Sequence, residues 1–268
     1  MEKYWFGQKL RCGILSKCYN KNEVIKLGEN NEDILINNWV GGPNGIIRVG
    51  EDLNSFYGYK RNGIYTVEDY ENGDITQDKI GRPNRSTNQE VLGKGVPSWT
   101  GSFINNLSYQ NFDLTVDLQY VYGVETLQQF YHSTYDRFGI TNGLREILTD
   151  AYNGSNPNTM QQAIYLTNNG HAGQDTNVDS QWVADGSYIR VNLIQLGYTF
   201  KPDLLSKMGF SALRIYASAN NPWLFTSKEF KGYDPESSSQ GEYKFGQNVT
   251  FFSYPRAKTF TFGLNLTL

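Results

Sequence analysis

The chain has 268 residues and a formal net charge of −3, from 24 Lys and Arg against 27 Asp and Glu, and 15% of its residues are aromatic. This charge balance argues against a nucleic-acid-binding surface, while the length allows one large β domain or two ordinary ones. No window approaches the roughly 18 consecutive apolar residues of a transmembrane helix. The aromatic content and the 27 Gly are typical of an all-β protein with long polar loops.

The first hundred residues carry weak structural signals. Residues 11–19 predict a short strand, and residues 20–97 read as an irregular, polar segment. Within that segment, residues 55–66 predict a small hairpin turning at Asn62 and Gly63, because Asn-Gly favours a two-residue hairpin turn. A run of roughly 77 residues without long periodic elements is unusual in a compact domain. It is ordinary on the extracellular side of an outer-membrane barrel.

Two well-patterned strands follow, at residues 98–109 and 111–122. The second strand carries apolar side chains on one face and polar side chains on the other, namely Phe112, Leu114, Val116 and Leu118 against Asp113, Thr115, Asp117 and Gln119. Each strand has about 11 residues, the length that crosses a bilayer as a tilted strand. Aromatic residues occupy both ends of these strands, where a membrane barrel places its interfacial belts.

A long insertion, residues 123–186, comes next and shows helical spacing twice. Leu127, Phe130, Tyr131, Tyr135 and Phe138 share one helical face in the first stretch. The second stretch, residues 144–151, places Leu144, Ile147, Leu148 and Ala151 together in the same way. We expect two loop helices, each with one packed face.

Residues 187–200 then predict a strand whose apolar phase slips, which indicates a β-bulge near Leu193. A turn at residues 201–209 should contain a single helical turn before the next strand at residues 211–221. A second long loop, residues 222–256, leads to the last strand.

The last stretch, residues 259–268, alternates without exception between apolar and polar or small side chains. Its apolar face consists of Phe260, Phe262, Leu264, Leu266 and Leu268. Such a face requires either the interior of a β-sandwich or lipid outside a barrel. Connections between strands are alternately short and long, so the long loops gather at one end, as in a transmembrane barrel. We therefore expect this row, and the row from Phe112 to Leu118, to face lipid.

Candidate site residues are sparse. Trp182, Trp223 and Tyr233 lie in predicted loops and are candidates for stacking on a substrate. Asp113 and Asp117 share one strand face and are read as acids lining a water-filled lumen rather than a catalytic pair. His132 and His171 have no partner pattern and are read as surface residues, and Cys12 and Cys18 are too few for a disulfide framework. We predict no metal site, no cofactor and no enzymatic activity.

Several motifs resemble the SusC/RagA family, the TonB-dependent outer-membrane nutrient transporters of Bacteroidetes. The matching stretches are residues 20–27, 55–60 with 62–65, 97–103, 185–190 with 196–200, 213–216 with 219–222, 232–236, and 254–255 with the last strand. The sequences Asp-Gly-Ser-Tyr-Ile-Arg at 185–190 and Gly-Tyr-Asp-Pro-Glu at 232–236 are among them. Seven matches in order, over roughly 250 residues, make the resemblance specific.

The resemblance implies a fold and partners. The expected fold is all-β: about five or six antiparallel strands of a 22-stranded transmembrane barrel, with long extracellular loops carrying short helices. The implied function is import of a nutrient such as a glycan or an oligopeptide across the outer membrane. The implied partners are a SusD-like surface lipoprotein, the TonB–ExbB–ExbD energy-coupling complex and outer-membrane lipid.

The same comparison predicts the domain organisation. Residues 19–268 are expected to form the C-terminal part of the receptor barrel, and residues 1–18 an atypical N-terminus of a truncated reading frame. The first residues also lack the apolar segment of a secretory signal. On its own such a chain is expected not to transport, because an open barrel edge leaves backbone groups facing hydrocarbon. The alternative from a different class is a soluble all-β carbohydrate-binding module, which the aromatic and acidic residues would also allow.

Overall fold

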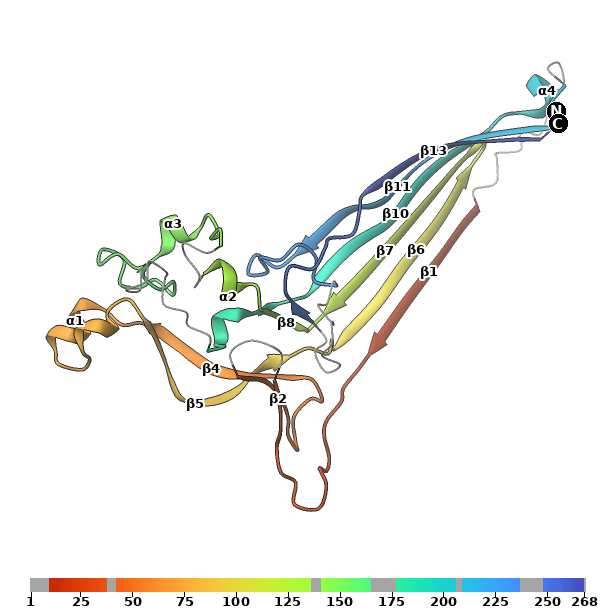
Figure 1. Cartoon of the computed structure of the whole chain (residues 1–268). Coiled ribbons are helices and arrows are strands. Elements are labelled where there is room, and N and C mark those ends of the chain that lie inside the picture. The colour runs from red at the N-terminus through yellow and green to blue at the C-terminus, as the bar shows by residue number, and fades with distance from the viewer. Residues whose placement is uncertain are drawn as a thin grey trace, which may run out of the picture.

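The computed structural model describes residues 10–37, 42–135, 141–164, 177–205, 209–236 and 248–267. The fold is all-β and is dominated by one antiparallel six-stranded sheet with the strand order β1-β6-β7-β10-β11-β13 (Figure 1). Its strands are β1 (Leu10–Tyr19), β6 (Trp99–Tyr109), β7 (Phe112–Tyr122), β10 (Tyr188–Thr199), β11 (Ala212–Thr226) and β13 (Thr259–Thr267). The strand count and the antiparallel pairing agree with the prediction.

The predicted pairings within this sheet are confirmed. Strand β6 pairs with β7, β10 with β11, and β11 with β13, all antiparallel. Strands β6 and β7 are joined by Gln110 and Asn111, and Gln110 adopts a positive φ of 54°, as a tight hairpin turn requires. Strand β1 pairs with β6 over its whole length and begins at Leu10.

The predicted bulge is also confirmed, and it explains the slip in the apolar pattern of β10. The register of β10 against β7 and β11 shifts between Val191 and Leu193. Asn192 is the extra residue relative to β7, while Asn221 and Pro222 together lie opposite it in β11. The bulge turns Leu193 to the face opposite Val191 and keeps the remaining apolar residues of β10 on one side.

The segment 20–97 is more regular than predicted. It holds a four-stranded sheet in the order β2-β3-β4-β5, with strands at Ile34–Asn37, Pro43–Ile47, Ser55–Ile64 and Pro83–Lys94. The helix α1 (Val67–Glu71) and the 3-10 turn η1 (Gln77–Lys79) lie between β4 and β5. The hairpin predicted at Asn62 and Gly63 is therefore wrong: β4 continues through both residues and pairs with β5. Register shifts along β4 accommodate the glycine, whose φ is 152°.

The helices of the 123–186 insertion are shorter than predicted. Leu127 lies in a strand, β8 (Glu125–Gln128), and only one turn, α2 (Tyr131–Thr134), follows it. The second stretch keeps one turn, α3 (Ile147–Asp150), and Phe138 lies outside the described residues. The remaining elements are η2 (Ser180–Trp182), β9 (Val183–Asp185), α4 (Pro202–Leu205) and β12 (Val249–Thr250). The turn α4 confirms the single helical turn predicted between β10 and β11.

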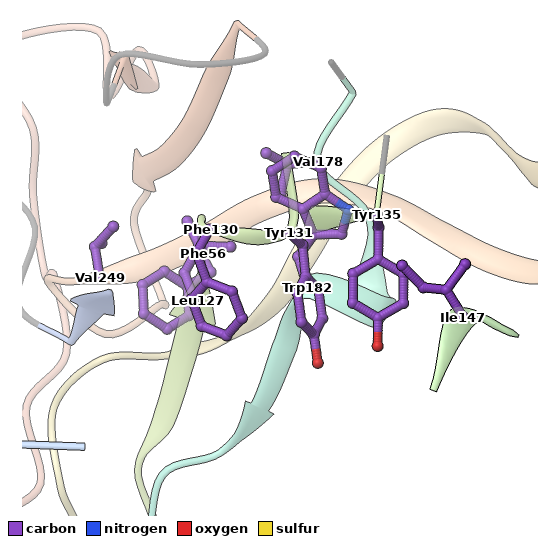
Figure 2. Close-up of a cluster of buried hydrophobic side chains, with 9 residues drawn as sticks. All are labelled: Phe56, Leu127, Phe130, Tyr131, Tyr135, Ile147, Val178, Trp182 and Val249. Carbon is purple, nitrogen blue, oxygen red and sulfur yellow. The ribbon is translucent and has the colours of Figure 1, made fainter. Parts of the chain in front are cut away.

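A hydrophobic core lies at the loop end of the molecule rather than on the large sheet. Figure 2 shows its members: Phe56, Leu127, Phe130, Tyr131, Tyr135, Ile147, Val178, Trp182 and Val249. They come from the small sheets, from α2 and α3 and from the segment around η2, which gather at one end of the long strands, while α4 lies at the other end (Figure 1). Leu127 and Tyr131 are four residues apart and both are buried, although Leu127 lies in β8 and Tyr131 in α2. The helix-like spacing of apolar residues in this stretch therefore reflects burial in a common core rather than one helix.

Candidate functional site

The register of the large sheet places both predicted apolar rows on one face. Leu114 pairs with Leu196, which pairs with Ala217, which pairs with Phe262. Directly opposed residues of antiparallel strands lie on the same face, so this row links β7 to β13. Phe262 is 84% exposed. We call this surface, which also carries Phe112, Val116, Leu118, Phe260, Leu264 and Leu266, the outward face.

Aromatic side chains mark both ends of the outward face. At the loop end, Trp99 pairs with Tyr122, and the rings of Tyr19 and Trp99 lie 4.5 Å apart. At the opposite end, the rings of Phe112 and Tyr198 lie 4.8 Å apart. Two aromatic belts separated by apolar strands are the pattern of a membrane-spanning sheet, with the belts at the two water interfaces.

The opposite face of the sheet, the inward face, is polar. The guanidinium of Arg214 on β11 donates to the carboxylate of Asp113 on β7, with Nη2 2.6 Å from Oδ2. The two side chains meet across β10 because Gly197 lies between them, and a Cβ there would lie 2.5 Å from Arg214 Nη2. Asp117 lies in the same row of β7 as Asp113.

A buried ion cluster joins the large sheet to residues 234–236, in the segment that follows β11. Arg190 on β10 is 1% exposed, and its Nη2 lies 2.6 Å from the carboxylate of Asp234, which is also buried. Its Nη1 donates to Asn221 at 2.7 Å, and its Nε lies 3.3 Å from Glu236. Arg256 contacts the same Glu236 at 2.8 Å from the exposed side. The cluster therefore fixes this segment onto the bulge of β10 and β11.

A second buried ion cluster holds the four-stranded sheet to the insertion. The carboxylate of Asp179, which is fully buried, accepts from Arg61 on β4 and Arg85 on β5, at 2.5 and 2.6 Å. Arg61 also donates to the backbone carbonyl of Met160 at 2.8 Å. Asp179 lies 118 residues from Arg61 and 94 from Arg85 along the chain. The cluster therefore links two segments that are far apart in the sequence.

A cavity of about 500 Å³ opens beside the core at the loop end. Tyr131 and Tyr135 line it, and Figure 2 shows their hydroxyls directed to the same side. The Tyr135 hydroxyl donates to Glu146, which also pairs with Lys231 at 3.2 Å. Burial raises the pKa of the Tyr131 and Tyr135 hydroxyls above its usual value. Gln161 Nε2, also at the wall, has no hydrogen-bond partner among the described residues.

The three aromatic residues predicted to contact substrate are not brought together. Trp182 is 2% exposed within the core, so its ring is closed to a ligand, contrary to the prediction. Trp223 pairs with Val191 and lies on the outward face rather than in a loop. Tyr233 is 72% exposed at the rim of a smaller cavity of about 310 Å³ near Phe130.

The other single-residue predictions have mixed outcomes. His132 is buried in α2, so its assignment to the surface is wrong, because the packed α2 turn encloses it. His171 and Leu268 lie outside the described residues. Among the residues that the structure describes, no group of three or more His, Cys, Asp or Glu has a metal-binding arrangement. None of the described helices is long and apolar enough to cross a bilayer.

Sequence relatives agree with this geometry. The TonB-dependent receptor P3 of Formosa agariphila is 29% identical over 268 aligned residues, which cover 92% of this chain and 26% of that protein. The TonB-dependent receptor SusC of Bacteroides thetaiotaomicron is 27% identical over 263 residues, covering 92% and 23%. The chain is similar in sequence to TonB-dependent receptors, SusC among them. No family profile matches it, and it spans about a quarter of the length of these relatives.

Solved structures confirm the fold of this chain. The RagAB peptide transporter superposes with a TM-score of 0.72 at 20% identity, over 97% of this chain and 27% of that one. The RagAB peptide importer in its closed-closed state gives 0.69 over 99% and 28%. At this identity the likeness shows the architecture alone. The six-stranded sheet has the fold of part of the β-barrel of that transporter.

The ion clusters were not predicted from the sequence, although a signal for one was present. Arg190 lies in one of the matching motifs, at 185–190, and Asp234 and Glu236 lie in another, at 232–236. The structure shows that these motifs meet through the Arg190 cluster. The second cluster, formed by Asp179 with Arg61 and Arg85, lies outside the motifs.

Proposed function

We propose that this chain forms part of the membrane-spanning barrel of an outer-membrane, TonB-dependent nutrient transporter, with the outward face in lipid. The observation that supports this best is the continuous apolar row from Leu114 to Phe262, bounded by aromatic belts. In water such a face would expose large apolar side chains across five neighbouring strands, which a soluble protein avoids. The carbohydrate-binding module is therefore disfavoured.

Labelling of single cysteines tests the orientation of the sheet. Cys12 and Cys18 are first replaced by serine, and one cysteine is then placed at Thr261 or at Phe262 in the protein within outer membranes. A water-soluble maleimide should label Thr261→Cys, whose position faces the lumen, at least about tenfold faster than Phe262→Cys, because thiolate reactivity requires water. Equal labelling of both positions, or the reverse order, would overturn the proposal.

The proposed partners are a SusD-type surface lipoprotein and the TonB–ExbB–ExbD complex, and a glycan or an oligopeptide is the proposed class of nutrient. One solved neighbour, RagAB, is described as a peptide importer, which keeps oligopeptides among the candidates. The long loops, above all residues 123–186, are the proposed lipoprotein contact, because their described parts share one hydrophobic core at one end of the strands (Figure 1).

Co-purification tests the partnership. The transporter, tagged and extracted from its own outer membrane in mild detergent, should retain a lipoprotein near one-to-one stoichiometry. Deletion of residues 141–164 should lower retention at least about fivefold without loss of the heat-modifiable barrel band, since the large sheet makes few contacts with this segment. Purification of the intact transporter without any lipoprotein would count against the proposal.

A further inference from the structure

Lys17 places a cation on the outward face near the loop end of β1. Lys17 on β1 pairs with Gly101, and the same row continues through Tyr120 to Ile189 and Phe225. The residues on the outward face of the other five strands are all uncharged. So are the remaining outward residues of β1 between Gly13 and Tyr19. A charged side chain on a membrane face is costly unless a counter-charge or water reaches it.

The ammonium of Lys17 lies against an aromatic wall. Its Nζ is 4.0 Å from the centre of the Trp99 ring, within the range of a cation–π contact. The Tyr120 ring extends over Gly101, where a Cβ would lie 2.4 Å from the ring. Lys17, Trp99 and Tyr120 line a surface hollow of about 740 Å³ that also includes Tyr122 and Phe225. The described residues give Lys17 no ion pair.

The position of Lys17 along the strand matches the level of lipid headgroups. The row on its loop side consists of aromatic residues, Tyr19, Trp99 and Tyr122, which form the belt. The row on its other side begins with Leu15 and Phe103, which belong to the apolar part of the face. A lysine at this boundary extends its ammonium toward the interface, where the negative groups of lipids lie.

We propose that Lys17, Trp99 and Tyr120 form a binding site for the phosphate group of a glycolipid headgroup in the outer leaflet. The ammonium supplies the positive charge, the hollow receives the upper part of the lipid, and the rings pack against its acyl or sugar portion. This inference rests on the proposed lipid contact of the outward face. It adds a specific lipid to that contact and is independent of the transported nutrient.

The test uses the intact transporter in a neutral maltoside detergent, with native mass spectrometry as the readout. Phosphorylated lipid A is titrated into the wild-type protein and into the Lys17→Gln, Lys17→Arg and Lys21→Gln variants. Lys17→Gln should bind about fivefold more weakly, the factor that one cation contributes near anionic lipid. Lys17→Arg should retain binding. Lys21→Gln, which removes an exposed lysine beyond the strand, should match the wild type.

Two controls, dephosphorylated lipid A and inorganic phosphate, separate recognition of the lipid's phosphate group from binding of the rest of the lipid or of free phosphate. Dephosphorylated lipid should bind the wild type and Lys17→Gln equally, and free phosphate at millimolar concentration should leave lipid binding unchanged. Equal binding of phosphorylated lipid to wild type and Lys17→Gln, or its displacement by free phosphate, would overturn the site. Brominated acyl chains should quench the outward tryptophans in every variant. If the tryptophan fluorescence is not quenched and neither phosphorylated nor dephosphorylated lipid A binds, the outward face does not contact lipid.

Discussion

Replacement of Arg190 by methionine is expected to lower the free energy of unfolding by about 3–5 kcal/mol, because it removes the buried guanidinium that pairs with the buried carboxylate of Asp234. Asp234 is 2% exposed and also accepts from the backbone N–H of Glu236, so it cannot turn to water without opening the segment that contains it. The measurement is the urea midpoint of the transporter folded in lipid vesicles, followed by tryptophan fluorescence. Limited proteolysis should also cut the segment that follows β11, around Asp234, faster in this variant.

A matched control separates the buried ion pair from simple loss of charge. Arg256→Met removes an arginine from the same cluster, but its side chain is 53% exposed and pairs with the rim residue Glu236. Exposed ion pairs contribute about 0–1 kcal/mol, so this variant should remain close to the wild type. The double variant Arg190→Met with Asp234→Asn should recover part of the loss. Equal effects of the two arginine substitutions would refute the role given to Arg190.

The parts of the fold that could be predicted are those with short-range signals. Strand β7 alternates strictly from Phe112 to Tyr120, and its turn to β6 spans two residues, so orientation and pairing follow from a few adjacent positions. Strand β13 shows the same alternation. The bulge at Asn192 was also predictable, because a change of apolar phase within one strand requires an extra residue.

The parts that could not be predicted depend on distant partners. The Asn62-Gly63 pair indicated a hairpin turn. In the structure β4 instead continues through both residues and pairs with β5, which follows α1 and η1 in the chain. Pairing with this distant strand outweighs the local turn preference. The spacing of Leu127 and Tyr131 indicated a helix because both are buried, yet a strand and a short turn bury them equally well. Arg190 and Asp234 lie 44 residues apart, and no periodicity connects them.

The second large effect is expected on the outward face itself. Val116 lies near the middle of β7, between Ile194 on β10 and Asn105 on β6. Arginine at this position should destabilise the folded barrel by about 2–4 kcal/mol, the cost measured for arginine on the lipid face near the bilayer midplane. The readout is the urea midpoint in lipid vesicles, with the fraction of heat-modifiable protein in the outer membrane as a second measure.

The adjacent residue provides the control, because neighbouring side chains of a strand point to opposite faces. The Thr115 hydroxyl donates a hydrogen bond to Asn106 Oδ1 at 2.8 Å on the inward face. Thr115→Arg should therefore lower the free energy of unfolding by only about 1 kcal/mol, from the loss of that hydrogen bond. Moving the same substitution by one residue thus changes the predicted effect at least about twofold. If Thr115→Arg proved the more damaging of the two, the lipid and lumen faces would have to be exchanged. In a soluble β-sandwich the Val116 side would be buried against a second sheet. Val116→Arg would then destabilise the protein equally in detergent, in lipid and in water.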